Sequence, residues 1–300
     1  MTRPAFSYYG GKQKLTQHII PLLNEIPHTV FCEPFCGGAA VLFAKGRRSV
    51  GNNNDYREII NDTNDWVITF YRVAKLQRDD LLRLIDATLY SQSDHSKAKG
   101  ILKSSVEHDD LTIAWAFYVQ VQMSFANKLF AGWGSQVINQ NSAATWNNKK
   151  RSIEAALDRL ADVHVSSEDA VRCIERWNSA HTLYFVDPPY IGTNQGHYAG
   201  YTADDWQNLC DALDNCKSSY VLSCYPQAIE PQSAQQRIEV STLCSASGKG
   251  RVGVDRSTMR TEEEMGDRAR TEVLWVCDRS SGIRSDLGRL ARLEQLALFA

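Results

Sequence analysis

The sequence predicts an α/β protein with a Rossmann-like sheet and a mostly helical insertion. Short apolar runs alternate with helical patterns over the first 75 residues, in the order strand, glycine turn, helix, strand, helix. That order is typical of a nucleotide-binding half-sheet. The alternation stops near residue 76, gives way to helical patterns alone, and resumes near residue 160. An interrupted α/β domain is the simplest fold with this pattern.

The elements follow from the periodicity of apolar residues, with short runs as strands and longer periodic stretches as helices. Before residue 76 we predict strands over 30–35 and 58–60 and helices over 16–26, 39–45 and 66–74. The middle stretch predicts helices around 81–85 and 113–125, and a polar, glycine-containing loop over 130–148. The last part predicts strands over 163–165, 183–186, 220–223 and 272–277 and helices over 170–177, 204–213 and 286–299. We therefore expect a catalytic domain made of 1–75 and 160–300, and a helical domain over 76–159.

The composition is ordinary for a globular protein that buries a sizeable core, with 23% charged and 43% hydrophobic residues. Apolar stretches as long as a membrane span or a signal peptide are missing, so we expect a cytoplasmic protein without a membrane partner. The eight cysteines form no paired CxxC spacing, which argues against a structural metal. Cys224 and Cys277 lie in apolar runs and are expected to be buried thiols.

The net charge of −2 does not decide whether the partner is a nucleic acid, because phosphate contact depends on local patches. Three basic clusters are candidates, at 45–48, 149–151 and 249–260. A solvated surface is the simpler explanation of any one of them. The third cluster is more suggestive, since Lys249 and Arg251 lie in a glycine-rich stretch, although an acidic run follows at 262–264.

The most informative motif is Asp187-Pro188-Pro189-Tyr190, directly after the predicted strand 183–186. Open α/β sheets bind ligands at the carboxyl ends of their strands, and the prolines make this turn stiff. Such a turn suits group transfer to a flat ring that bears an amine. Asp187 and the Pro188 carbonyl would accept hydrogen bonds from the amine, and Tyr190 would stack on the ring. Taken alone, the motif also fits a simple turn with Asp187 as a cap.

A second motif is the glycine turn at Gly37 and Gly38, between a predicted strand and a helix. Small residues at this place let a ligand approach the backbone. Asp62 ends the next strand 25 residues after Gly37, which fits an acid that binds ribose hydroxyls. The alternative for Asp62 is a cap of the helix that begins near Asn64. The chain has no GxxxxGK[ST] loop, so ATP-type phosphoryl transfer has little support.

Together these motifs resemble the Dam-like branch of the amino-methyltransferases that modify adenine in DNA. The matching stretches are YYGGK at 8–12, EPFCGGA at 33–39, INDTN at 60–64 and DPPY at 187–190. The resemblance covers about residues 5–75 and 160–278. It implies an S-adenosylmethionine-dependent methyltransferase fold with an inserted target-recognition domain. The implied reaction transfers a methyl group to the N6 amine of adenine in double-stranded DNA, without a metal.

The resemblance also implies roles for single residues. The residues implied to bind the cofactor are Tyr8, Lys12, Phe35, Gly37, Asp62, Asp169 and Asp187. Within this set, Asp62 would bind the ribose, Asp169 the adenine amine of the cofactor, and Tyr8 with Lys12 its methionine end. The chain departs from the family pattern at Ala39, where a glycine is usual, and at Tyr8, where tryptophan is frequent.

The target base would have to leave the duplex, at a cost of a few kcal/mol. Stacking on Tyr190 would return about 1–3 kcal/mol of this. The insertion would select the DNA sequence, with Asn127 and Lys128 as candidate DNA-binding residues beside Lys249 and Arg251.

Several alternatives stay open at this point. The same chemistry could act on cytosine, RNA or a protein amide, although the acid of the tetrapeptide disfavours cytosine and glutamine. A catalytically silent DNA-binding protein with the same fold is the alternative of a different class. We expect double-stranded DNA as the partner, a monomer or weak dimer, and a bacterial or phage-encoded protein that associates with the nucleoid.

Overall fold

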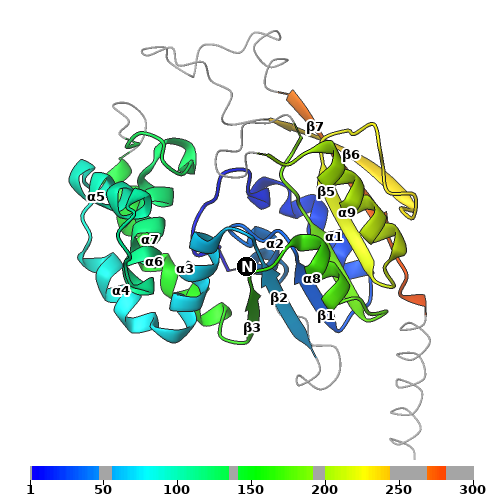
Figure 1. Cartoon of the computed structure of the whole chain (residues 1–300), viewed down its shortest axis with the longest axis horizontal. Coiled ribbons are helices and arrows are strands. Elements are labelled where there is room, and N and C mark those ends of the chain that lie inside the picture. The colour runs from blue at the N-terminus through cyan, green and yellow to red at the C-terminus, as the bar shows by residue number, and fades with distance from the viewer. Residues whose placement is uncertain (1, 47–55, 135–140, 192–199, 244–268, 282–300) are drawn as a thin grey trace, which may run out of the picture.

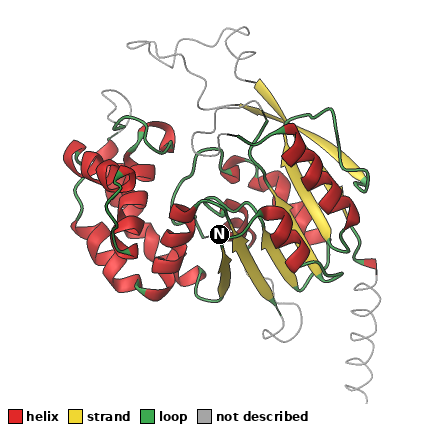
Figure 2. Ribbon diagram, viewed as in Figure 1, coloured by secondary structure: helices red, strands yellow, loops and turns green. Residues whose placement is uncertain are grey.

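The computed structural model describes residues 2–46, 56–134, 141–191, 200–243 and 269–281. It contains a seven-stranded sheet in the order β3-β2-β1-β4-β5-β7-β6, beside a group of helices (Figures 1 and 2). The strands are β1 Val30–Glu33, β2 Arg57–Asn61, β3 Val163–Ser166, β4 Thr182–Val186, β5 Ser219–Cys224, β6 Gln236–Leu243 and β7 Ala269–Cys277. The predicted Rossmann-like sheet is confirmed.

The pairing of the strands explains where the sheet can bind a ligand. β1 runs parallel to β2 and β4, β2 to β3, and β4 to β5. β7 is antiparallel to both β5 and β6. The five parallel strands therefore end at the same edge, with the strand order reversing beside β1, which is where doubly wound folds bind ligands.

Helices cover both faces of the sheet. They are α1 Thr16–Glu25, α2 Ala40–Lys45, α3 Asp65–Leu76, α8 Ala170–Arg176 and α9 Ala203–Asn215. Alternating side chains of β1 show the two layers, because Phe31 joins the apolar cluster of α1 and α2 while Cys32 joins that of α8 and α9. A buried strand with both faces covered reads as a continuous apolar run, which is why these strands could be recognised in the sequence.

The middle of the chain is helical, as predicted, and its helices lie at the left of Figure 1. They are α4 Arg78–Ala87, α5 Gln92–Lys103, α6 Asp110–Met123 and α7 Ser142–Arg159, with the short 3-10 helices η1 Lys12–Lys14 and η2 Phe125–Asn127 elsewhere. Helix α6 is central, since every residue from Ala114 to Met123 is buried. Its Phe117 packs against Phe6 and Phe70, with ring centroids 5.2 and 6.2 Å apart. The apolar core is thus continuous between the helical part and the sheet, and the division at 76–159 stays a prediction.

The sequence prediction differs from the structure at three elements. Helix α7 begins at Ser142, inside the stretch predicted as a loop over 130–148. Helix α5 and the edge strand β6 were not predicted as elements. The predicted helix over 286–299 lies outside the described residues.

Two expectations drawn from composition can also be compared with the structure. Cys224 and Cys277 are buried free thiols, as predicted. Among the described residues, no helix has both the length and the apolar character needed to cross a bilayer.

Candidate active site

The predicted site residues come together because their segments follow neighbouring strands. Gly37 comes after β1, Asp62 after β2, Asp169 after β3 and Asp187 after β4. These four strands are parallel neighbours, so all four segments lie at the same edge of the sheet. The geometry of this edge can be described from the Asp187 turn outward.

Asp187 forms a buried ion pair with Lys12, the first residue of η1, with Nζ 2.8 Å from Oδ1. Burial disfavours the carboxylate and raises the pKa of Asp187 to about 6, although Lys12 acts in the opposite direction. Burial lowers the pKa of Lys12, but the charges of Asp187 and Glu272 outweigh it, so this pKa lies above its ordinary value. At neutral pH the pair is therefore an ammonium group beside a carboxylate.

Tyr190 is buried next to this pair. Its hydroxyl donates to Glu272 Oε2 at 2.6 Å, and Lys12 Nζ lies 4.6 Å from its ring centroid. The Tyr225 ring packs against it with centroids 4.5 Å apart and planes inclined by 63°. Glu272 is itself buried in β7 and also accepts a hydrogen bond from Ser223 Oγ at 3.5 Å. An acid of β7 thus fixes the ring of the turn that follows β4.

The glycine turn is closed by Tyr8. Gly37 has φ of +45°, and a Cβ at this position would lie 2.9 Å from Tyr8 Cδ1, so a larger residue does not fit. The Gly37 N–H donates to Asp62 Oδ2 at 2.8 Å, and the Asn64 N–H donates to Asp62 Oδ1 at 2.9 Å. Asn64 Nδ2 in turn donates to the Tyr8 hydroxyl at 3.1 Å. Three predicted cofactor residues, Tyr8, Gly37 and Asp62, therefore form one connected group.

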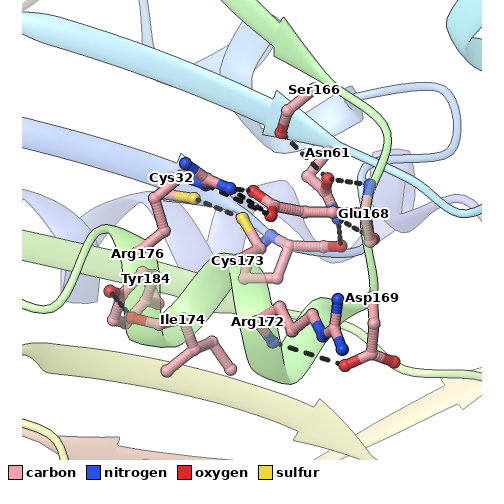
Figure 3. Close-up of polar contacts among 11 residues, drawn as sticks. Cys32, Asn61, Ser166, Glu168, Asp169, Arg172, Cys173, Ile174, Arg176 and Tyr184 are labelled. Carbon is pink, nitrogen blue, oxygen red and sulfur yellow. Dashed lines mark hydrogen bonds and ion pairs between the residues drawn. The ribbon is translucent and has the colours of Figure 1, made fainter.

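Asn61 ties the ends of three strands together (Figure 3). Its Nδ2 donates to the Pro34 and Glu168 carbonyls, each at 2.9 Å. Its Oδ1 accepts from the Glu168 N–H at 3.0 Å and from Ser166 Oγ at 2.9 Å. The loops after β1 and β3 are thus held at fixed positions around the end of β2.

Asp169 lies on the exposed side of this edge. Its Oδ1 accepts from the N–H groups of Val171 and Arg172 at 2.9 and 3.3 Å, which makes it the N-cap of α8. It also lines an open pocket of about 670 Å³, together with Glu168 and the exposed Arg176 that pairs with Glu168. Asp169 therefore has a structural role as a cap whether or not it binds a ligand.

Phe35 and the two prolines complete the edge. Phe35 is half-buried after β1, and its ring meets that of Tyr201 edge-on with centroids 6.3 Å apart. Pro188 is buried and Pro189 is partly exposed. Pro188 and Pro189 continue the chain directly from Asp187 to Tyr190.

The sequence reasoning missed three polar residues of this region, Glu33, Asn61 and Glu272. Glu33 ends β1 and accepts the Leu42 N–H at 2.5 Å. Burial raises the pKa of Glu33 to about 8, so this acid is largely neutral at pH 7. Each missed residue is a polar side chain at or inside an otherwise apolar strand, and that contrast is the signal that could have found them.

The predicted DNA-binding residues Asn127 and Lys128 lie in the loop 124–134, which joins α6 to the segment before α7. A β-bridge between Ser124 and Trp133 closes the loop. Asn127 has φ of +54°, and Ala126 and Phe130 also have positive φ. Such backbone is strained in residues other than glycine and persists only where surrounding contacts hold it.

This loop, which we call the 124–134 loop, touches the candidate active site. Lys128 Nζ lies 5.6 Å from the ring centroid of Tyr9, next to the predicted cofactor residue Tyr8. Phe125 projects from the loop with 59% of its surface exposed. Lys249 and Arg251, the other two predicted DNA-binding residues, lie outside the described residues.

A comparison with known families identifies the family of the chain. The sequence model of the D12 class N6 adenine-specific DNA methyltransferases matches residues 8–237, from the Tyr8 turn to β6. The chain belongs to this family. Its reaction is the methylation of adenine N6 in DNA, as predicted from the motifs. The family match thus favours adenine in DNA over cytosine, RNA or a protein amide.

Two individual proteins are similar to this adenine methyltransferase. The Type II methyltransferase M1.LlaDCHI of Lactococcus lactis subsp. cremoris is 25% identical over 237 residues, which cover 73% of this chain and 78% of the relative. Among solved structures, the rRNA methyltransferase aviRa of Streptomyces viridochromogenes aligns with a TM-score of 0.38 and 11% identity. That alignment covers 92% of this chain and 88% of the other.

Proposed function

We propose that the methyl donor is S-adenosylmethionine, bound at the ends of β1, β2 and β3. The residues present fit this cofactor, because Asp62 is a buried acid at the end of β2 that suits ribose hydroxyls. Gly37 lies beside it, with its N–H on Asp62 Oδ2, under the ring of Tyr8. Asp169 lines an open pocket that suits the donor's adenine amine. When bound, the donor supplies an electrophilic methyl group. Tyr8, in the segment before η1, and Phe35, directly after β1, would cover it.

The target amine would bind where Lys12 Nζ lies in this structure. The observation that carries the proposal is that Asp187, a buried acid at the end of β4, already holds a nitrogen cation at 2.8 Å. The Asp187 carboxylate and the Pro188 carbonyl would accept hydrogen bonds from the adenine amine and orient its lone pair. As the nitrogen gains positive charge, a fixed carboxylate stabilises the transition state more than the ground state.

The target base would reach this site by flipping out of the duplex. Lys12 would leave Asp187 and the face of Tyr190, and the base would take its place on the ring. Tyr190 is ready to receive it, because its hydroxyl is anchored to Glu272 and Tyr225 supports it. The displaced Lys12 could then pair with the carboxylate of the donor's methionine end. Pro188 and Pro189 would keep the turn rigid during this exchange.

Double-stranded DNA would be contacted through the 124–134 loop. Asn127 can bond base edges and Lys128 can bond phosphates or bases. The exposed Phe125 beside them suits insertion between bases. We propose that Lys249 and Arg251 also contact the DNA, on the basis of the sequence alone. We also propose a monomer or weak dimer in the cytoplasm. A role in a restriction-modification system is supported by the name of the similar Type II methyltransferase.

The test is methyl transfer from S-adenosylmethionine with a labelled methyl group to unmethylated duplex DNA, followed by nucleoside analysis. Label is expected in N6-methyladenine. Asp187→Ala should lower kcat by roughly 10²–10³ or more, the range for loss of one electrostatic group. The control is Asp211→Ala, an exposed acid of α9 that should leave turnover unchanged. Full turnover by Asp187→Ala, or label in cytosine, would contradict the proposal.

A further inference from the structure

A second pocket lies between the N-terminal segment and helices α2, α6 and α7. It has a volume of about 580 Å³ and is separate in its lining from the Asp187 site. The described residues that line it include two cations, Arg3 and Lys149, eight neutral polar side chains and no acid. A cavity of this composition favours an anion, since hydroxyl, amide and ammonium groups all donate hydrogen bonds.

Lys149 is the less exposed of the two cations that line this pocket. Its Nζ donates to the Gln122 carbonyl at 3.2 Å, and no ion pair to an acid is recorded for it within the described part of the chain. Burial lowers the pKa of Lys149 to about 8, so it is still mostly charged at neutral pH. The pocket therefore holds an ammonium group for which the described residues provide one carbonyl acceptor and no carboxylate.

The neighbouring Lys150, on the same helix, differs from Lys149 because it has a carboxylate partner. Its Nζ donates to the Asp86 carbonyl at 2.8 Å and lies 3.8 Å from the Asp86 carboxylate. Lys150 does not line the pocket. The basic cluster at 149–151, uniform in sequence, is thus divided by the fold into a lysine with a carboxylate partner and a lysine that faces a cavity.

The position of the pocket indicates the source of the anion. Ser7 and Gln13 line it, and they flank the segment that carries Tyr8 and Lys12. Gln122 is two residues before the 124–134 loop. Arg3 and Gln13 are exposed, so the pocket is reached from the surface. The opening therefore adjoins, along the chain, the two segments through which we propose that DNA is bound.

We propose that the pocket receives a phosphate of the DNA backbone, with Lys149 and Arg3 as its charged ligands. The proposal rests on the proposed function, because it takes the duplex to lie over the Asp187 site. It adds a contact that fixes the position of the duplex and carries no sequence information of its own. Neutral donors around the pocket complete the set of hydrogen bonds to the phosphate oxygens.

The test measures affinity for a short fluorescein-labelled duplex by anisotropy over a series of salt concentrations. Each neutralised phosphate contributes about 0.9 to the slope of log K against log salt. Lys149→Gln should therefore weaken binding at low salt and reduce the slope by about one. Lys150→Gln removes the same charge from the same helix and should leave the slope unchanged. Equal slopes for both variants would overturn the proposal.

Two further variants guard against a folding artefact. Lys149→Arg keeps the charge and should keep the slope, while Arg3→Gln changes an exposed side chain and should reduce the slope. Wild-type slopes in both Arg3→Gln and Lys149→Gln would contradict the assignment of these two residues to a phosphate site.

A last comparison separates DNA from a free anion. At constant ionic strength, inorganic phosphate could raise the melting temperature of the wild type but not of Lys149→Gln, while all proteins keep equal DNA slopes. That result would assign the pocket to free phosphate and reject DNA as its ligand. A wild-type protein that binds DNA without methylating it would instead refute the proposed function and leave the slope test valid.

Discussion

At the scale of single residues, the site combines two buried acids with one buried lysine. Asp187 and Glu272 both act on Lys12, and the charge of Glu272 helps to raise the pKa of Asp187. Tyr190 lies between the two acids, with its hydroxyl on Glu272. Glu272 therefore positions the ring and also tunes the acid that is proposed to bind the target amine.

This arrangement predicts how activity depends on pH. A raised pKa means that Asp187 loses its charge as the pH falls through about 6, so kcat/KM should fall there. Glu272→Gln keeps a hydrogen-bond acceptor for Tyr190 but removes the negative charge. The pKa of Asp187 should then decrease, and the acidic limb of the kcat/KM profile should move to lower pH.

The control for this prediction is Glu239→Gln, which removes an acid of β6 that pairs with Arg237 at the surface. It should leave the acidic limb where it is. An acidic limb that does not move in Glu272→Gln would show that Glu272 has no electrostatic effect on Asp187.

At the scale of elements, the glycine turn after β1 shows why a short motif carries so much information. Gly37 and Gly46 both have positive φ, +45° and +69°. A Cβ on Gly37 would meet Tyr8 at 2.9 Å, whereas a Cβ on Gly46 would meet nothing within 4 Å. Both positions need a positive φ, and Gly46, with ψ of 173°, lies in a backbone region that is open essentially to glycine alone. The contact with Tyr8 is found at Gly37 and not at Gly46.

Gly37→Ala should therefore weaken donor binding more than Gly46→Ala does. Both variants lose stability because alanine disfavours a positive φ, and Gly46→Ala should lose at least as much as Gly37→Ala. Only Gly37→Ala should also displace Tyr8 and weaken donor binding, which calorimetric titration with S-adenosylmethionine can measure for both variants. Equal affinities would show that Tyr8 does not contribute to the donor site.

Elements with a regular apolar pattern were predictable from the sequence, and those without one were not. The parallel strands are buried on both faces, and their apolar runs gave bounds within about two residues of the structure. Helix α7 starts with polar residues and is set by the Asn141 side chain, which accepts from the Ala144 N–H at 3.0 Å. Strand β6 is an edge strand, and over 236–241, where its burial is described, Ile238 and Val240 are the residues that alternate inward. Both depend on tertiary contacts.

The candidate site was predictable to the same extent. The motif residues Gly37, Asp62 and Asp187 stand in short local patterns that indicate a methyltransferase site. Glu272 and Lys12 act through partners far away in the chain, such as Tyr190 and Asp187, and the pairing exists only after β7 and η1 have been placed. No local periodicity contains that information.

At the scale of the whole molecule, the helical part and the sheet share one apolar core. Phe6, before the Tyr8 turn, packs against Phe70 of α3 and Phe117 of α6, with ring centroids 5.0 and 5.2 Å apart. The Tyr8 ring also lies 6.3 Å from that of Phe117. The part expected to read DNA is thus packed directly against the turn expected to bind the donor.

This shared core predicts that the molecule unfolds as a unit. Phe117→Ala should lower the free energy of unfolding by about 3–5 kcal/mol, the usual cost of truncating a buried phenylalanine. Leu89→Ala, at an exposed position of the helical part, should cost far less. Tryptophan fluorescence can follow both parts, because Trp115 and Trp146 lie in the helical part and Trp206 and Trp275 around the sheet. Fluorescence and far-ultraviolet circular dichroism should then give coincident transitions, whereas two separate transitions would show that the helical part is an independent domain.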